Sequence, residues 1–117
     1  MAKEISWVKE KLEEIIDSAR KLDFPAFSDL ERKHILLREE RAKVDRQVDV
    51  VLEQAGLPRG TETDDSRDTL WRQADAEARA EFGPLAEKEM MNGFYLQEVI
   101  HRYAALLADA AVKEMEE

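Results

Sequence analysis

The sequence predicts an all-α fold: an antiparallel four-helix bundle in which a long helical hairpin is followed by a second hairpin. Charged residues make up 38% and hydrophobic residues 44% of the 117-residue chain, with only 4 glycines and 3 prolines. This composition is typical of helical proteins and poor in the turn residues that β proteins need. Apolar residues also recur every three or four positions along four segments, which is the period of a helix with one buried face. At this length we expect a single domain over residues 1–117.

The first predicted helix covers residues 5–22. It ends before Pro25, because the residue that precedes a proline is pushed out of the α region. Trp7 points away from the apolar stripe, so we expect it to cover a loop or to contact a second chain. The stripe consists of Ile5, Val8, Leu12, Ile15, Ala19 and Leu22.

The second predicted helix runs from a capping box at Ser28 and Glu31 to Gly56, a length of roughly 40 Å. Such a helix overhangs a compact domain of this size, whose radius of gyration is about 13 Å. Its length therefore predicts an extended hairpin or an oligomer. Its stripe consists of Leu30, His34, Leu37, Arg41, Val44, Val48, Val51 and Ala55.

Two more helices follow a polar, acidic loop. Gly83 and Pro84 end the third helix. We then expect a short helical turn over residues 85–91 and a turn at Asn92 and Gly93, before a last helix over residues 94–116. The apolar residues of the third helix are Leu70, Trp71, Ala74, Ala78 and Phe82.

The last helix is apolar on two faces, a pattern typical of a buried helix. One face carries Leu96, Val99, Ile100, Tyr103, Leu107 and Ala110. Because every helix of a lone four-helix bundle exposes one side, the second face needs a cover, and a second copy of the chain is the simplest candidate. The sequence therefore predicts a homodimer with an interface of Phe94, His101, Ala105, Ala108 and Val112.

The negative charge is unevenly distributed. The net charge is −9, and residues 1–61 carry 13 acids and 12 bases, whereas residues 62–117 carry 14 acids and 6 bases. A polyanion does not attract nucleic acid or an anionic membrane, so we expect no direct binding to either. The acidic half contacts a basic partner, imitates the phosphates of a nucleic acid, or only keeps the chain soluble. The residues that we select for partner binding are Glu62, Asp64, Asp65 and Asp68, with Trp7 and Tyr95 as aromatic anchors if exposed.

Both histidines follow a glutamate by three residues, in the pairs Glu31–His34 and Glu98–His101. At this spacing the two side chains share a helix face and can bind one metal ion. Two such motifs occur in the di-iron and di-manganese centres of ferritin-like bundles. An alternative hypothesis is therefore an iron- or manganese-binding bundle with oxidase or storage activity. Against it, Glu98 and His101 lie away from the main apolar face of their helix, so the two motifs do not converge in one monomer. A metal site across a dimer interface, with His101 from each chain, stays open.

His34 and Arg41 occupy two positions of the stripe of the second helix, seven residues apart. A buried arginine needs a partner, which we expect among the acids of the third or fourth helix. This polar layer fixes the register of the helices, as polar core residues do in coiled coils, or it lines a ligand pocket. The sequence leaves both alternatives open.

No motif indicates catalysis. The chain has no cysteine, which excludes disulfides and cysteine-based sites. It contains no serine-nucleophile motif and no glycine-rich phosphate loop. Neither a signal-peptide-like stretch nor a run of about 18–20 apolar residues is present. We therefore expect a non-catalytic cytoplasmic protein without a cofactor, which binds another protein as an adaptor, inhibitor or immunity-type partner.

Overall fold

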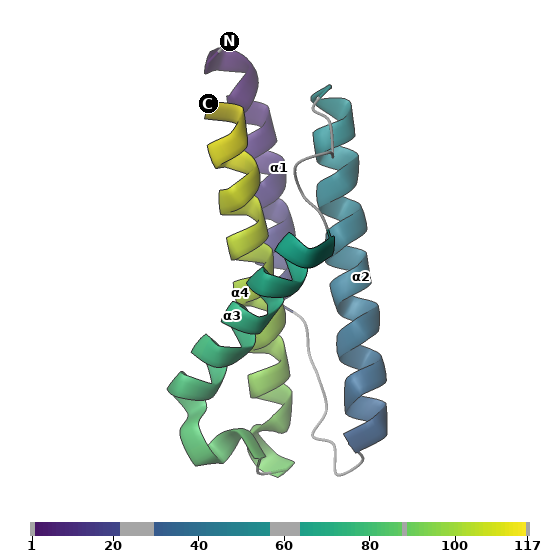
Figure 1. Ribbon diagram of the computed structural model, residues 1–117, viewed down its shortest axis with the longest axis vertical. Coiled ribbons are helices and arrows are strands. Elements are labelled where there is room, and N and C mark those ends of the chain that lie inside the picture. Colours follow the sequence, from purple (N-terminus) through teal and green to yellow (C-terminus); the bar gives the residue numbers. More distant parts are fainter. Residues whose placement is uncertain (1, 22–29, 57–63, 88, 117) are drawn as a thin grey trace.

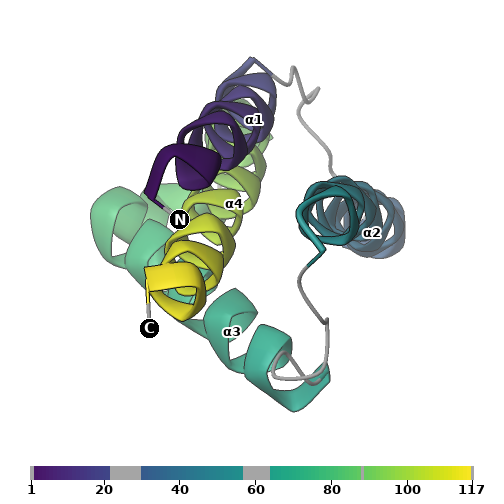
Figure 2. The same ribbon diagram turned by 90° about the horizontal axis from the view of Figure 1, so that it is seen from above.

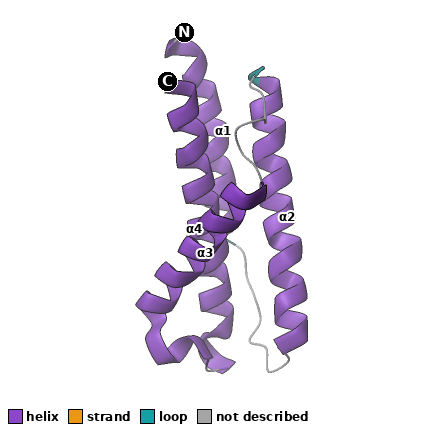
Figure 3. Ribbon diagram, in the orientation of Figure 1, coloured by secondary structure: helices purple, strands orange, loops and turns teal. Residues whose placement is uncertain are grey.

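The chain is all-α over the residues that the structure, a computed structural model, describes (Figure 1). These residues are 2–21, 30–56, 64–87 and 89–116. Helix fills nearly all of this part of the chain (Figure 3), in agreement with the predicted fold class. The elements are α1 (Ala2–Arg20), α2 (Leu30–Gln54), α3 (Asp64–Phe82), the short 3-10 helix η2 (Gly83–Glu87) and α4 (Glu89–Glu116).

Helix α4 lies at the centre of the packing, because it contacts α1, α2, α3 and η2. Seen from above, α1 and α3 lie close against α4, and α2 lies farther from α4, on the right of the view (Figure 2). This arrangement corrects the expectation that no helix of the bundle is surrounded. The apolar second face of α4 is explained largely by its own three neighbours, so the face does not by itself require a second chain.

The core is built from the predicted stripes. All four helices contribute apolar residues that are almost fully buried, and the apolar ones of α3 are alanines, which allow α3 and α4 to approach closely. Ile5, Leu22 and Leu30 of the predicted stripes lie outside the residues whose burial is described. The buried stripe residues are Val8, Leu12, Ile15, Ala19, Val44, Val48, Val51, Ala74, Ala78, Leu96, Val99, Ile100, Tyr103 and Leu107.

The predicted turn at Asn92 and Gly93 is wrong, because α4 already begins at Glu89 and continues through both residues. A glycine inside a helix costs about 1 kcal/mol relative to alanine. Phe94, which follows Gly93, is exposed, but the next two residues, Tyr95 and Leu96, are buried. Burying one large side chain gains about 1.5–3 kcal/mol, which outweighs the local preference for a turn.

Two of the predicted helix ends use glycines with positive φ. Gly83 (φ 57°) ends α3, as predicted. Gly56 (φ 72°) follows α2, and its N–H donates to the carbonyl of Glu53 at 3.0 Å, which confirms the predicted helix stop. The predicted capping box cannot be compared, because Ser28 and the side chain of Glu31 lie outside the described residues.

The molecule is elongated, with extents of 48 × 26 × 22 Å and a radius of gyration of 15.0 Å. The 25 residues of α2 span about 38 Å at 1.5 Å per residue. The long helix therefore fits along the long axis, beside α1 and α4, without overhanging (Figure 1). None of the described helices is both long enough and apolar enough to cross a bilayer.

Candidate functional site

A buried polar network ties α3 to α2. Its centre is Arg67 on α3, which is only 2% exposed. The Nη2 of Arg67 donates to Oδ1 of Asp49 at 2.6 Å, and its Nη1 lies 3.3 Å from Oδ1 of Asp45. Tyr103 of α4 donates its hydroxyl proton to the same oxygen of Asp45 at 2.5 Å. Three helices therefore meet at Asp45, which fixes their relative register.

Arg41 extends this network toward the surface. Its Nη2 donates to Oδ1 of Asp68 at 2.5 Å, which confirms the predicted acidic partner on the third helix. The guanidinium carbon lies 5.4 Å from the ring centroids of both Trp71 and Tyr103. These two rings pack edge to face, with their centroids 5.2 Å apart. Ion pairing and cation–π contacts together hold the Arg41 guanidinium in one place.

Arg67, Asp45 and Asp49 were not predicted as site residues. One signal was available: Arg67 precedes Leu70, Trp71 and Ala74 by three, four and seven residues, so it continues the apolar stripe of the third helix. Asp45 and Asp49 each follow a buried valine of α2, at the edge of its stripe. Their side chains are shielded in part because Arg67, near the start of α3, reaches across to both of them.

A second cluster surrounds Arg102 of α4. Arg102 donates to Glu98 at 2.7 Å and to Glu77 at 3.3 Å, and it also pairs with Glu81. Elsewhere on α3, Asp75 pairs with Arg79 at 3.2 Å. Arginines therefore neutralise much of the described acidic charge of α3.

These pairs change the predicted partner surface. Asp68 is bound to Arg41, so it has a role inside the fold, although its carboxylate stays half exposed. Glu62 lies outside the described residues, and so do the side chains of Asp64 and Asp65. On α1, in contrast, the acidic side chains of Glu10, Glu13, Glu14 and Asp17 are all exposed.

Tyr95 is not an exposed anchor, because it is only 2% exposed. Its hydroxyl donates to Asp75, its ring packs edge to face on Phe82, and Arg79 lies over the ring. Burial raises the pKa of Tyr95 well above its usual value, and the negative charge of Asp75 raises it further. Trp7, the other predicted anchor, is exposed on α1.

The predicted dimer face is only partly free. Ala108 is buried, which contradicts its placement in an interface with a second chain. His101, Ala105 and Val112 are half-buried, and Val112 packs against the core of its own chain. Phe94 alone among the five residues is strongly exposed, at 60%. Most of the predicted interface residues are covered by their own chain because α1, α2 and α3 surround α4.

The structure separates the two histidines. His34 is exposed, so its predicted place in the core is wrong: every fully buried residue of α2 for which burial is described lies at or beyond Val44. His101 faces α1, where Nη2 of Arg20 donates to its Nε2 at 3.1 Å. Burial and the charge of Arg20 lower the pKa of His101, although Glu98 opposes this shift.

These placements bear on the metal hypothesis. Glu98 is bound to Arg102, and the side chain of Glu31 lies outside the described residues. Within the described part of the chain, no three or more histidine, aspartate or glutamate side chains gather in a group that could hold a metal ion.

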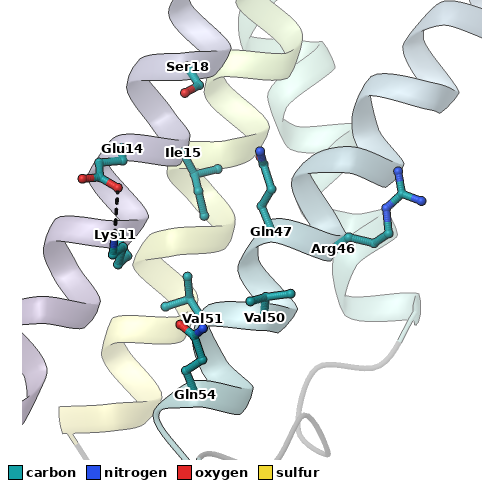
Figure 4. A pocket seen from close by; sticks show the side chains of 9 residues that line it. All are labelled: Lys11, Glu14, Ile15, Ser18, Arg46, Gln47, Val50, Val51 and Gln54. Carbon is teal, nitrogen blue, oxygen red and sulfur yellow. Dashed lines mark ion pairs between the residues drawn. The ribbon is translucent and has the colours of Figure 1, made fainter.

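Two hollows lined by described residues are candidate binding surfaces. The larger, which we call the α1–α2 groove, has a volume of about 430 Å³ (Figure 4). The smaller, which we call the cationic hollow, has a volume of about 260 Å³ and lies where α2 meets Trp71 of α3. The groove is lined by Lys11, Glu14, Ile15 and Ser18 of α1 and by Arg46, Gln47, Val50, Val51 and Gln54 of α2. The hollow is lined by His34, Leu37, Arg38, Arg41 and Trp71.

No protein-family model, curated protein or solved structure matches the chain. Function is therefore inferred from the surfaces of the molecule itself.

Proposed function

We propose that this chain is a small cytoplasmic protein-binding module, an adaptor, inhibitor or immunity-type protein, that binds a helix of its partner in the α1–α2 groove. The observation that carries the proposal is the make-up of this groove. Three of its nine lining residues, Ile15, Val50 and Val51, are apolar, and the other six are polar or charged. An apolar centre inside a polar rim is the usual arrangement of a protein–protein interface.

Val50 supports the choice of this surface. It is 50% exposed although it lies next to the buried Val51 on a helix that packs against the core. In this proposal α1 and α2 keep the antiparallel order of the predicted hairpin. The partner helix lies in the α1–α2 groove and turns a stripe of its own apolar residues toward the groove.

The charges beside the groove indicate the chemistry of the partner. Glu14 lines the rim, where it pairs with Lys11 at 3.5 Å (Figure 4). Glu10 and Asp17 are one turn away from Glu14 on the same side of α1, and both are exposed. A partner helix with basic residues beside its apolar stripe complements this edge. The predicted acidic contact surface is thereby moved from the third helix to α1.

Site-specific photo-crosslinking in the host cell tests the proposal. A photoreactive residue at Val50 is expected to give one adduct of defined mass. The matched control is Ile35, an equally exposed β-branched residue of α2 that does not line the groove. Added unlabelled protein should suppress the adduct, and so should Ile35→Asp protein, whereas Val50→Asp protein should not. Equal adducts at both positions, or equal competition by Val50→Asp protein, would contradict the proposal.

The predicted homodimer is kept as a proposal, with its contact moved to the end of the molecule where α4 begins. Phe94 and Leu85 are both exposed there, and two exposed large apolar side chains at one end favour self-association. Light scattering should give twice the chain mass of 13.5 kDa for the wild type and the monomer mass for Phe94→Asp. A wild-type protein that stays monomeric at high concentration contradicts this arrangement.

A further inference from the structure

The cationic hollow differs in charge from the rest of this acidic chain. Three of its five lining residues, His34, Arg38 and Arg41, carry basic side chains, and the remaining two are Leu37 and Trp71. No acidic residue is among those that line it, although the chain carries 27 aspartates and glutamates. Asp68 and Asp45 already pair with Arg41, so among the described residues Arg38 supplies the unpaired positive charge of this hollow, and the hollow is thereby suited to a negatively charged ligand.

The two arginines have different roles in the fold. Arg41 is fixed by Asp68 and by the rings of Trp71 and Tyr103, so its position is set before any ligand arrives. Arg38 is exposed, and it forms no ion pair with any residue that the structure describes. Arg38 can therefore turn its full charge to a ligand, beside a guanidinium that is already in place.

Trp71 adds a second recognition element. Its indole is half-buried and lines the hollow together with Leu37, so an apolar or flat group can pack there. The volume of about 260 Å³ lies just below the range of drug-sized pockets, which limits the ligand to about one substituted ring.

From these observations we infer that the cationic hollow binds an aromatic phosphate monoester, with the ring against Trp71 and Leu37 and the phosphate between Arg38, Arg41 and His34. Phosphate is favoured over carboxylate because three donor-bearing side chains line the hollow, and phosphate offers three oxygens in a tetrahedral arrangement. This inference is independent of the α1–α2 groove, since the two hollows share no residue. It also develops the ligand-pocket alternative for the His34 and Arg41 layer.

Fluorescence titration of a Trp7→Phe protein tests the inference, because Trp71 is then the only tryptophan. The probes are phenyl phosphate, inorganic phosphate, benzoate and a short phosphotyrosine peptide, at constant ionic strength in a phosphate-free buffer. We expect saturable binding of phenyl phosphate, about tenfold tighter than that of inorganic phosphate or benzoate. Comparable saturable binding of the peptide identifies a protein side chain as the source of the group, and binding of phenyl phosphate alone identifies a free small molecule.

Two variants make the test specific. Arg38→Gln should weaken the binding of phenyl phosphate at least about tenfold, the usual size of a lost charge-assisted contact. Arg46→Gln removes an exposed arginine of the same helix that lines the groove instead, and should change binding less than about twofold. Circular dichroism should show both variants folded. Equal weakening by the two variants, tighter binding of benzoate, or no saturable binding of phenyl phosphate overturns the inference. Val50→Asp should leave the binding of phenyl phosphate unchanged, so the proposal for the α1–α2 groove and the inference for the cationic hollow are tested separately.

Discussion

Arg67 sets the position of α3 on α2. Its guanidinium is buried between helices and pairs with Asp45 and Asp49, whose side chains are each 24% exposed. Burying a charge without partners is strongly unfavourable, so α3 can pack here only in the register that brings Arg67 to both carboxylates. The hydroxyl of Tyr103 adds α4 to the same contact.

We predict that Arg67→Met lowers the free energy of unfolding by about 3 kcal/mol. The variant leaves Asp45 and Asp49 without their buried cation, and partial exposure of the two carboxylates keeps the loss at the lower end of the range for broken buried pairs. Arg79→Met on the same helix is the matched control. The side chain of Arg79 is 53% exposed, so its pair with Asp75 contributes under about 1 kcal/mol. Urea denaturation measures the free energy of unfolding of both variants. Equal losses would contradict the prediction that the buried pairs of Arg67 contribute more to stability than the exposed pair of Arg79.

At the scale of whole elements, α2 shows what periodicity can predict. The stripe of α2 was predicted correctly in direction, and Val44, Val48 and Val51 are buried. Periodicity gives the side of a helix that faces its neighbours, but not how far along the helix those neighbours extend. His34 lies on the predicted side and is nevertheless exposed, because the fully buried residues of α2 begin ten positions later, at Val44. His34, which was predicted to lie in the core, therefore lines the open cationic hollow instead.

Helix boundaries were predictable where a local signal acts alone. The stops at Gly56 and Gly83 coincide with positive φ angles. The stop at Gly93 failed because burial of Tyr95 and Leu96 outweighs a local turn preference, and burial depends on contacts that lie far away in the sequence.

We predict that Gly56→Ala lowers the free energy of unfolding by about 1 kcal/mol. No heavy atom lies within 4 Å of the added Cβ, so the loss arises from backbone strain at φ 72° and not from a clash. Asparagine tolerates this conformation better than alanine, so Gly56→Asn should lose less. Thermal unfolding of the three proteins checks the order, and an alanine variant as stable as the wild type would contradict it.

For the whole molecule, α4 joins the other helices into one packing unit. The sequence indicated that this helix is apolar on two faces, but not whether its own chain or a second copy covers them, because both give the same pattern. The acidic residues are a similar case, because the sequence shows where they are but not what they contact. Their number in residues 62–117 was evident. Asp75 and Arg79 pair four residues apart within α3, whereas the pairs of Asp68 with Arg41 and of Glu81 with Arg102 depend on where α3 lies relative to α2 and α4.

The ionisation of the two tyrosines of the chain shows whether both ends of α4 belong to one common core. Both belong to α4 and both are almost fully buried, Tyr103 against Asp45 and Tyr95 against Asp75. Burial raises the pKa of Tyr103, as does the hydrogen bond to Asp45, while the charge of Arg41 opposes the shift. The pKa of Tyr95 is raised in the same way by burial and by Asp75.

We predict that tyrosinate forms only as the protein unfolds. A folded-state pKa above the unfolded value of about 10 means that the neutral tyrosines contribute their full stability below pH 10 and lose it as the pH rises further. In an alkaline titration the tyrosinate absorbance should therefore appear together with the loss of helical circular dichroism. The same titration in concentrated urea should give a midpoint near pH 10, the value of free tyrosine. If one tyrosine ionises near pH 10 while the helical signal is unchanged, that end of α4 is open to solvent and does not belong to the common core.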